Sequence, residues 1–279
     1  MMMLGVVGCS NEAKEQDEKS KEFMKERLIA DQFISNEKLQ EEYLDQNNEK
    51  IEPKKNDVTE EGQPKERKLE KTSKHNQQSN SEGKTTTNEQ LKNQGITMVN
   101  LLLPEEVSEP REKPVTHIVL HFTSNGVKNP ENPYDIEEIY DTFTDYGVSA
   151  HYLVGREGQV YELVTEERVA YHAGQGTLQS FPQYKDELNQ YSIGIEIMAI
   201  GTREEMGLMM PDSIYDSISE SDIGYTEAQY QTINHLVDAI ITSNPGIKKN
   251  REHIVGHDEY APDRKTDPGS LFDWREIGL

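Results

Sequence analysis

The side chains best suited to chemistry in this sequence are its histidines, and their spacing limits how they act together. The chain has eight histidines, and four of them form two pairs, His117 with His121 and His253 with His257, each within a short apolar run that predicts a β-strand. Residues four apart on a strand share a face but lie about 13 Å apart along it. Because zinc ligands each lie ~2.0–2.1 Å from one ion, each pair contributes at most one ligand.

His121 and His257 are the better candidates of the two pairs, because they stand where the predicted strands open into loops and binding residues gather at such ends. Asp267 follows His257 across a loop interrupted by proline and glycine, and such a loop can bring a carboxylate back to an imidazole. Two histidines and one carboxylate, with a fourth position left for water, form a catalytic zinc arrangement. From spacing alone the alternative stays open that all three residues are structural.

The composition restricts the classes of partner. The formal net charge of −23 argues against nucleic acid, whose phosphates repel an acidic protein, and it weakens adsorption to anionic lipid. The chain has one cysteine, Cys9, so an intrachain disulfide is excluded and a metal site must use His, Asp or Glu. Cys9 also lies far from the predicted folded domain, which disfavours a cysteine hydrolase.

The N-terminal third of the chain differs in texture from the rest. Residues 1–9, MMMLGVVGC, are similar to the end of a truncated bacterial lipoprotein signal, in which the cysteine is acylated. Acyl chains on Cys9 would anchor the protein to a membrane of the cell envelope, outside the cytoplasm. An ordinary N-terminus, or secretion, is the alternative. Residues 10–95 read as a polar low-complexity linker, partly helical, with an end-to-end distance on the order of 50 Å as a flexible tether.

Residues 96–279 alternate predicted strands with amphipathic helices, which indicates an α/β domain. Strands are predicted at 115–122, 150–155, 159–164, 192–200 and 253–257, and helices at 133–147 and from Thr226 to the residue before Asn244. Thr226 with Gln229 has the pattern of a capping box. The acidic stretch 201–225 is predicted to be a loop, and the turn-rich stretch 256–274, GHDEYAPDRKTDPGSLFDW, is predicted to contain no helix.

Five ordered motifs carry a resemblance to a known family: THIVLHFT, SAHYLVGREGQVYELV, VAYHAGQG, YSIGIEI and GHDEYAPDRKTDPGSLFDW. In this order and spacing they resemble the zinc-dependent N-acetylmuramoyl-L-alanine amidases of type 2, which are related to peptidoglycan recognition proteins. The resemblance covers roughly residues 96–279. It implies a single mixed central β-sheet flanked by helices, a Zn²⁺ cofactor, a peptidoglycan or muropeptide substrate, and a monomer.

The resemblance also implies roles for individual residues. The zinc ligands would be His121, His257 and Asp267. Glu196 would be the general base, Lys265 would stabilise the oxyanion, and His172 and Arg264 would lie near the substrate groove. One branch of the family uses a tyrosine where this chain has Ala150, which leaves Glu196 as the base. Asp263 stands where relatives commonly have glycine, in a loop whose other motif residues are in place.

The expected activity is therefore hydrolysis of the amide bond between N-acetylmuramic acid and L-alanine. A non-catalytic peptidoglycan-binding module on the same fold is the alternative, although a pure binder need not keep all five chemical residues. Intact cell wall, released muropeptides and their 1,6-anhydro form all stay open as substrates.

Overall fold

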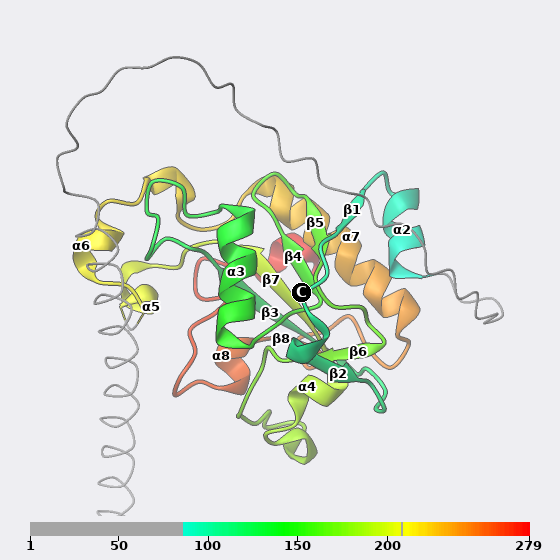
Figure 1. The fold of residues 1–279 in the computed structure, drawn as a ribbon. Coiled ribbons are helices and arrows are strands. Elements are labelled where there is room, and N and C mark those ends of the chain that lie inside the picture. The colour runs from blue at the N-terminus through cyan, green and yellow to red at the C-terminus, as the bar shows by residue number, and fades with distance from the viewer. Residues whose placement is uncertain (1–85, 208) are drawn as a thin grey trace, which may run out of the picture. The chain divides into compact units, whose positions relative to one another are not determined.

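A mixed six-stranded β-sheet forms the centre of the part of the chain that the computed structural model describes, residues 86–207 and 209–279 (Figure 1). Its strands, in spatial order, are β1 (Met98–Asn100), β5 (Val160–Glu162), β4 (Tyr152–Val154), β7 (Ser192–Met198), β3 (His117–Thr123) and β8 (Ile254–Gly256). Neighbouring strands are parallel except for the antiparallel pair β4 and β5. The predicted mixed central sheet is confirmed.

Helices and a small second sheet surround this central sheet. The antiparallel pair is β2 (Ser108–Pro110) with β6 (Arg168–Ala170). The α-helices are α2 (Thr87–Asn93), α3 (Ile136–Tyr146), α4 (Leu188–Tyr191), α5 (Arg203–Met206), α6 (Asp212–Tyr215), α7 (Glu227–Ser243) and α8 (His257–Tyr260). Short 3-10 helices are η1 (Glu105–Val107), η2 (Pro182–Tyr184), η3 (Glu220–Asp222) and η4 (Trp274–Ile277).

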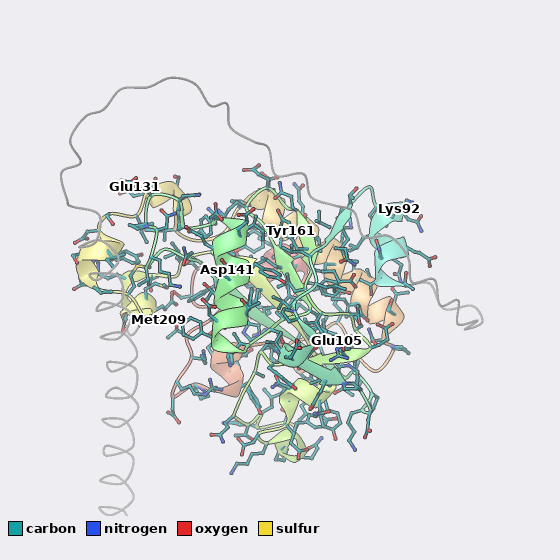
Figure 2. All side chains as sticks on the ribbon, viewed as in Figure 1. Lys92, Glu105, Glu131, Asp141, Tyr161 and Met209 are labelled. Carbon is teal, nitrogen blue, oxygen red and sulfur yellow. The ribbon has the colours of Figure 1, made fainter. Side chains whose placement is uncertain are left out.

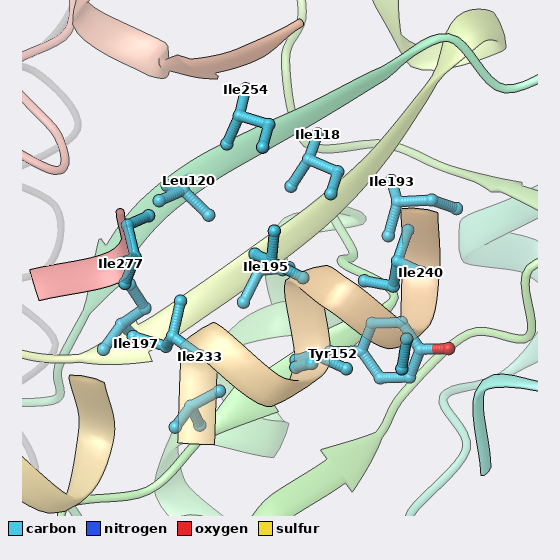
Figure 3. Packing of buried hydrophobic residues seen from close by; sticks show 14 of the residues in the cluster. Ile118, Leu120, Tyr152, Ile193, Ile195, Ile197, Ile233, Ile240, Ile254 and Ile277 are labelled. Carbon is cyan, nitrogen blue, oxygen red and sulfur yellow. The ribbon is translucent and has the colours of Figure 1, made fainter. Parts of the chain in front are cut away.

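Helix α7 packs against one face of the central sheet and forms the largest core (Figure 3). The predicted capping box is present, because Gln229 N donates to Thr226 Oγ1 at 3.1 Å and Thr226 N donates to Gln229 Oε1 at 2.9 Å. Ile233 and Ile240 from the helix, with Ile195 from β7, are fully buried in this core. Burying each such side chain contributes about 1.5–3 kcal/mol. Helix α7 therefore covers this face of the sheet, so a functional site is expected on the opposite face.

Helix α3 packs on the opposite side of the sheet through Ile139 and Phe143. The Asp135 side chain caps its N-terminus by accepting from Glu137 N, and the helix ends at Gly147, whose φ of 63° suits glycine. The outer side of the helix is polar, and Asp141 lies there (Figure 2). The helix covers only part of this face.

The fold begins before the predicted boundary at residue 96. Residues 87–93, predicted as linker, form helix α2, in which Leu91 is fully buried in the α7 core while Lys92 lies on the outer side (Figure 2). Thr86 and Glu89 supply a capping box that starts this helix. The predicted signal at 1–9, Cys9 and linker residues 10–85 lie outside the described residues. Within 86–207 and 209–279, no helix combines the length and the apolar character needed to cross a bilayer.

The stretch 201–225 is not the simple loop that was predicted. It contains α5, α6 and η3, and a small apolar cluster holds these short helices together. Ile200, Met206, Met210 and Ile218 form the buried part of that cluster. Scattered methionines and isoleucines among acidic residues gave no helical or strand period in the sequence, and their shared cluster appears only in three dimensions.

The prediction of no helix in 256–274 is also wrong, because α8 is one helical turn beginning at His257 and η4 follows at the end of the stretch. The turn forms because Glu259 Oε2 accepts from Gly256 N at 2.7 Å and Ala261 N donates to His257 O at 2.8 Å. The first residue of this turn is thus a predicted metal ligand. His257 projects from a helix start and not from a strand.

His117 is fully buried away from His121, between the rings of Phe181, Tyr184 and His253. Burial, with a smaller contribution from His253, lowers the pKa of His117 from 6.5 to about 4. Below pH 6.5 the His117 side chain becomes protonated in the unfolded chain, whereas in the folded protein it stays neutral down to about pH 4. The free energy of unfolding therefore decreases as the pH falls from 6.5 to about 4.

We expect a His117→Phe variant to lose less stability on acidification than the unchanged protein, by about 2–3 kcal/mol between pH 7 and pH 4.5. Phenylalanine retains the edge-to-face aromatic packing but cannot take up a proton. The measurement is urea unfolding of both metal-free proteins at the two pH values. Equal losses of unfolding free energy in the two proteins would contradict the assignment of this acid sensitivity to His117.

Candidate metal centre

The register between β3 and β7 places His121 directly beside Glu196. The two strands are parallel and His121 pairs with Glu196, so their side chains lie on the same face of the sheet. Ile195 and Ile197 point to the opposite face, where they join the α7 core. Because side chains alternate along the strand, the residues on either side of Glu196 anchor β7 in the core, and the Glu196 side chain lies on the same face as His121.

His257 reaches the same place from the neighbouring strand β8. The register pairs Leu120 of β3 with Gly256 of β8, so the next residues, His121 and His257, come side by side. Their Nδ1 atoms are 3.0 Å apart, and both side chains are buried. Two residues far apart in the sequence are thus joined by strand pairing.

The loop after α8 adds Asp267, as predicted. Its Oδ2 lies 2.8 Å from His121 Nδ1 and 3.0 Å from His257 Nδ1. The loop is held because Asp258 N donates to the Asp267 carbonyl at 2.8 Å. One ligand atom from each of the three residues lies within 4.8 Å of the others. The structure therefore brings together the predicted trio.

The outer nitrogen of His257 shows which of its ring atoms is free to bind. Nε2 lies 2.9 Å from the backbone carbonyl of Ala173, which can only accept a hydrogen bond, so Nε2 carries the proton. In the neutral ring Nδ1 then offers a lone pair toward the Asp267 carboxylate, with no hydrogen between the two atoms. Such facing lone pairs suit a cation, and two imidazoles with a carboxylate suit Zn²⁺.

The protonation of the neighbouring groups depends strongly on burial. Burial lowers the pKa of His121 to about 4, so the ring is neutral near pH 7, as a metal ligand must be. Burial raises the pKa of Glu196 well above its usual value, the charge of Asp267 raises it further, and Lys265 acts in the opposite sense. Glu196 Oε2 is buried and has no hydrogen-bond partner among the described residues. It is a carboxyl group available for proton transfer.

His172 and Arg264, assigned to the substrate groove from resemblance, have partners inside the protein. His172 Nδ1 lies 3.0 Å from His121 Nε2, and His172 Nε2 lies 3.1 Å from Ser192 Oγ. Arg264 donates through Nη2 to the carbonyls of Ala173 and Gln175. His172 therefore contacts the predicted ligand His121, and Arg264 contacts the same carbonyl as the predicted ligand His257. The contact of His172 and Arg264 with substrate stays a prediction. Lys265 is half-buried in the same loop.

Two polar residues near the centre were not singled out from the sequence. Asn189 lies in α4, and its side chain accepts hydrogen bonds from the backbone of residues 172 and 173. Ser192 begins β7 and contacts His172. An asparagine and a serine before an apolar strand carry no signal of their own, since both are common at helix ends and turns.

The sequence matches a protein-family model, and the names of similar proteins agree with the description of that family. Residues 111–270 match the model described as N-acetylmuramoyl-L-alanine amidase. The 1,6-anhydro-N-acetylmuramyl-L-alanine amidase AmpD of Escherichia coli (strain K12) is 36% identical over 127 residues, which are 46% of this chain and 55% of AmpD. The AmpD of Haemophilus influenzae (strain ATCC 51907 / DSM 11121 / KW20 / Rd) is 32% identical over 176 residues, 63% of this chain and 79% of the relative.

Solved structures are also similar to this chain, and one of them holds a bound muropeptide. It is the complex of the N-acetylmuramyl-L-alanine amidase AmiD from E. coli with anhydro-N-acetylmuramic acid-L-Ala-D-gamma-Glu-L-Lys, with 29% identity and a TM-score of 0.44. The match covers 58% of this chain and 56% of that chain. The chain spans about half the length of the AmpD of Escherichia coli.

Proposed function

We propose, from the premise that this chain belongs to the N-acetylmuramoyl-L-alanine amidase family, that it hydrolyses the amide bond between N-acetylmuramic acid and L-alanine in peptidoglycan or muropeptides. The observation that carries the proposal is the convergence of His121, His257 and Asp267, with Glu196 paired beside His121 across two strands. Three ligands for one ion and an adjacent carboxyl group form a hydrolytic centre.

The three ligands would hold Zn²⁺, and each is suited to it. The two imidazoles are on rigid elements, at β3 and at the start of α8, and the carboxylate is on a loop pinned by a backbone hydrogen bond. When bound, Zn²⁺ supplies Lewis acidity and lowers the pKa of water.

Glu196 is proposed as the group that moves protons. Its Oε2 atom is buried and has no hydrogen-bond partner among the described residues, and the pKa of the carboxyl group is raised by burial. A carboxylate in such surroundings accepts a proton from the attacking water and returns it to the leaving nitrogen, which would otherwise depart as an unstable anion. The apolar Ile195 and Ile197 behind it keep the strand in place.

Lys265 is proposed to stabilise the oxyanion. It lies two residues before Asp267, and its charge acts on both Glu196 and His121. A positive group at the position where the tetrahedral oxyanion develops lowers the barrier, and one well-placed donor is worth about 10²–10³ in kcat. The backbone N–H of Lys265 donates to Ala261 O at 2.9 Å, which fixes the loop carrying it.

The envelope location and the lipid anchor at Cys9 are also part of the proposal, and the sequence alone supports them. The acidic charge of the chain makes an acyl anchor a more effective means of membrane attachment than surface adsorption. Mass analysis of the N-terminal peptide from membranes of an expressing bacterium tests this. An unmodified cysteine there would remove the anchor from the proposal.

Purified peptidoglycan and defined muropeptides test the activity. We expect new L-alanine amino termini to appear with the zinc-loaded protein, to disappear after chelation and to return on adding Zn²⁺. Mass spectrometry of the products from intact and 1,6-anhydro muropeptides identifies the preferred substrate. If the zinc-loaded protein releases no new termini yet binds peptidoglycan, the chain is a binding module and the enzymatic proposal is wrong.

A further inference from the structure

The dipeptide His172–Ala173 contacts both histidine ligands on the side away from the metal site. His172 Nδ1 lies 3.0 Å from His121 Nε2, and the Ala173 carbonyl lies 2.9 Å from His257 Nε2. A single short segment thus holds the outer nitrogen of each ring. Whatever fixes this dipeptide also fixes the direction in which both ligands present their lone pairs.

The backbone carbonyl of Leu188 determines which atom donates and which accepts in the hydrogen bonds around His172. Ser192 Oγ lies 2.7 Å from Leu188 O, and because a carbonyl can only accept, the hydroxyl donates there. The hydroxyl oxygen then accepts from His172 Nε2 at 3.1 Å. With its proton on Nε2, the neutral His172 ring has a bare Nδ1 that accepts from His121 Nε2. His121 Nδ1 is left without a proton and faces Asp267.

Asn189 holds the backbone of the same dipeptide. Its Oδ1 accepts from His172 N at 3.1 Å and from Ala173 N at 2.8 Å, so one amide oxygen fixes both peptide groups. Gly194 leaves the space that the His172 ring occupies, because a Cβ there would lie 2.5 Å from His172 Cγ. Asn189 and Ser192 stand at the junction of α4 and β7, and neither is among the metal ligands.

We propose that Asn189 and Ser192 are positioning residues of the metal centre, which act through His172–Ala173 to present the bare Nδ1 atoms of His121 and His257 to the ion. The inference rests on the proposed zinc site and extends it to residues outside the ligand set. Partners of this kind orient ligating histidines, and their loss costs about 10–100-fold in metal affinity.

Zinc affinity of the full-length protein, measured by competition with a chromophoric chelator, tests the proposal. We expect Asn189→Ala and Ser192→Ala each to weaken zinc binding about 10–100-fold. Gln190→Ala is the matched control, because this neighbouring amide side chain donates to Glu109 and not to the dipeptide. Asn189→Asp keeps an acceptor for both N–H groups and is expected to retain most of the affinity.

Ring-nitrogen NMR of the metal-free proteins gives a readout that a merely structural role would not change. We expect His121 and His257 to carry their protons on Nε2 in the unchanged protein, and His121 to populate both tautomers in Ser192→Ala. Ser192→Ala removes one oxygen only, so this arm decides the question even if Asn189→Ala does not fold.

The two proposals fail in different ways. If the unchanged protein binds no Zn²⁺, the proposed function is wrong. If it binds Zn²⁺ but Ser192→Ala and a folded Asn189→Ala bind as tightly as Gln190→Ala, with unaltered tautomers, the positioning inference alone is overturned.

Discussion

A Glu196→Gln variant is expected to lose amidase turnover by about 10²–10⁴-fold while retaining about one zinc ion per chain. Glutamine has the same shape as glutamate but cannot accept the proton of the attacking water. Glu196 is not among the three residues whose ligand atoms converge, so we expect zinc binding not to depend on it. Release of L-alanine amino termini gives the rate, and elemental analysis of the purified protein gives the zinc content.

Glu162→Gln provides the control for this experiment. Glu162 is also a half-buried strand carboxylate with a pKa raised by burial, but it lies on β5, which β4 separates from β7. We expect this variant to keep full turnover. Loss of zinc from Glu196→Gln would identify Glu196 as a ligand, and turnover close to that of the unchanged protein would remove it from the mechanism.

An Asp267→Ala variant is expected to bind Zn²⁺ at least about 100-fold more weakly and to lose activity at ordinary zinc concentrations. The substitution removes the only charged ligand of the trio and leaves His121 Nδ1 and His257 Nδ1 facing each other at 3.0 Å. Chelator competition measures the affinity. Activity titrated against added Zn²⁺ shows whether the ion can still be loaded.

Asp263→Asn tests whether any carboxylate of this loop would serve. Asp263 is exposed and lies four positions before Asp267. We expect its substitution to leave zinc affinity unchanged within about 2-fold, because an exposed charge is screened by solvent. A comparable loss of affinity in both variants would mean that the loop's overall charge, and not ligation by Asp267, holds the ion.

The elements that local patterns encode were predictable. The apolar period and the Thr226–Gln229 capping box placed α7, and short β-branched runs placed β3 and β7, since hydrogen bonding and side-chain alternation within one segment determine these features. Spacing also excluded His117 and His121 as ligands of one ion. In the structure His117 stacks on His253 instead, with ring centroids 5.2 Å apart.

The predictions that were wrong depended on contacts between distant residues. Helix α2 was assigned to a polar linker because its own sequence is polar, but its buried apolar side chain, Leu91, packs in the core that α7 forms. The helices of 201–225 are held by scattered apolar residues that have no period. Tertiary packing outweighs local propensity in both segments.

For the metal centre, the sequence by itself predicted three ligands, a general base and a lysine, because ordered motifs resembling a known family specify residue types, and the structure brings the three predicted ligands together. Only the tertiary structure decided how these residues are arranged. The registers of β3 with β7 and β8 bring His121 beside Glu196 and His257. In a neutral imidazole one ring nitrogen carries the proton, and the hydrogen-bond partner of that nitrogen determines which of the two has a free lone pair. Those partners, the Ala173 carbonyl and His172 held by Asn189 and Ser192, come from another part of the chain.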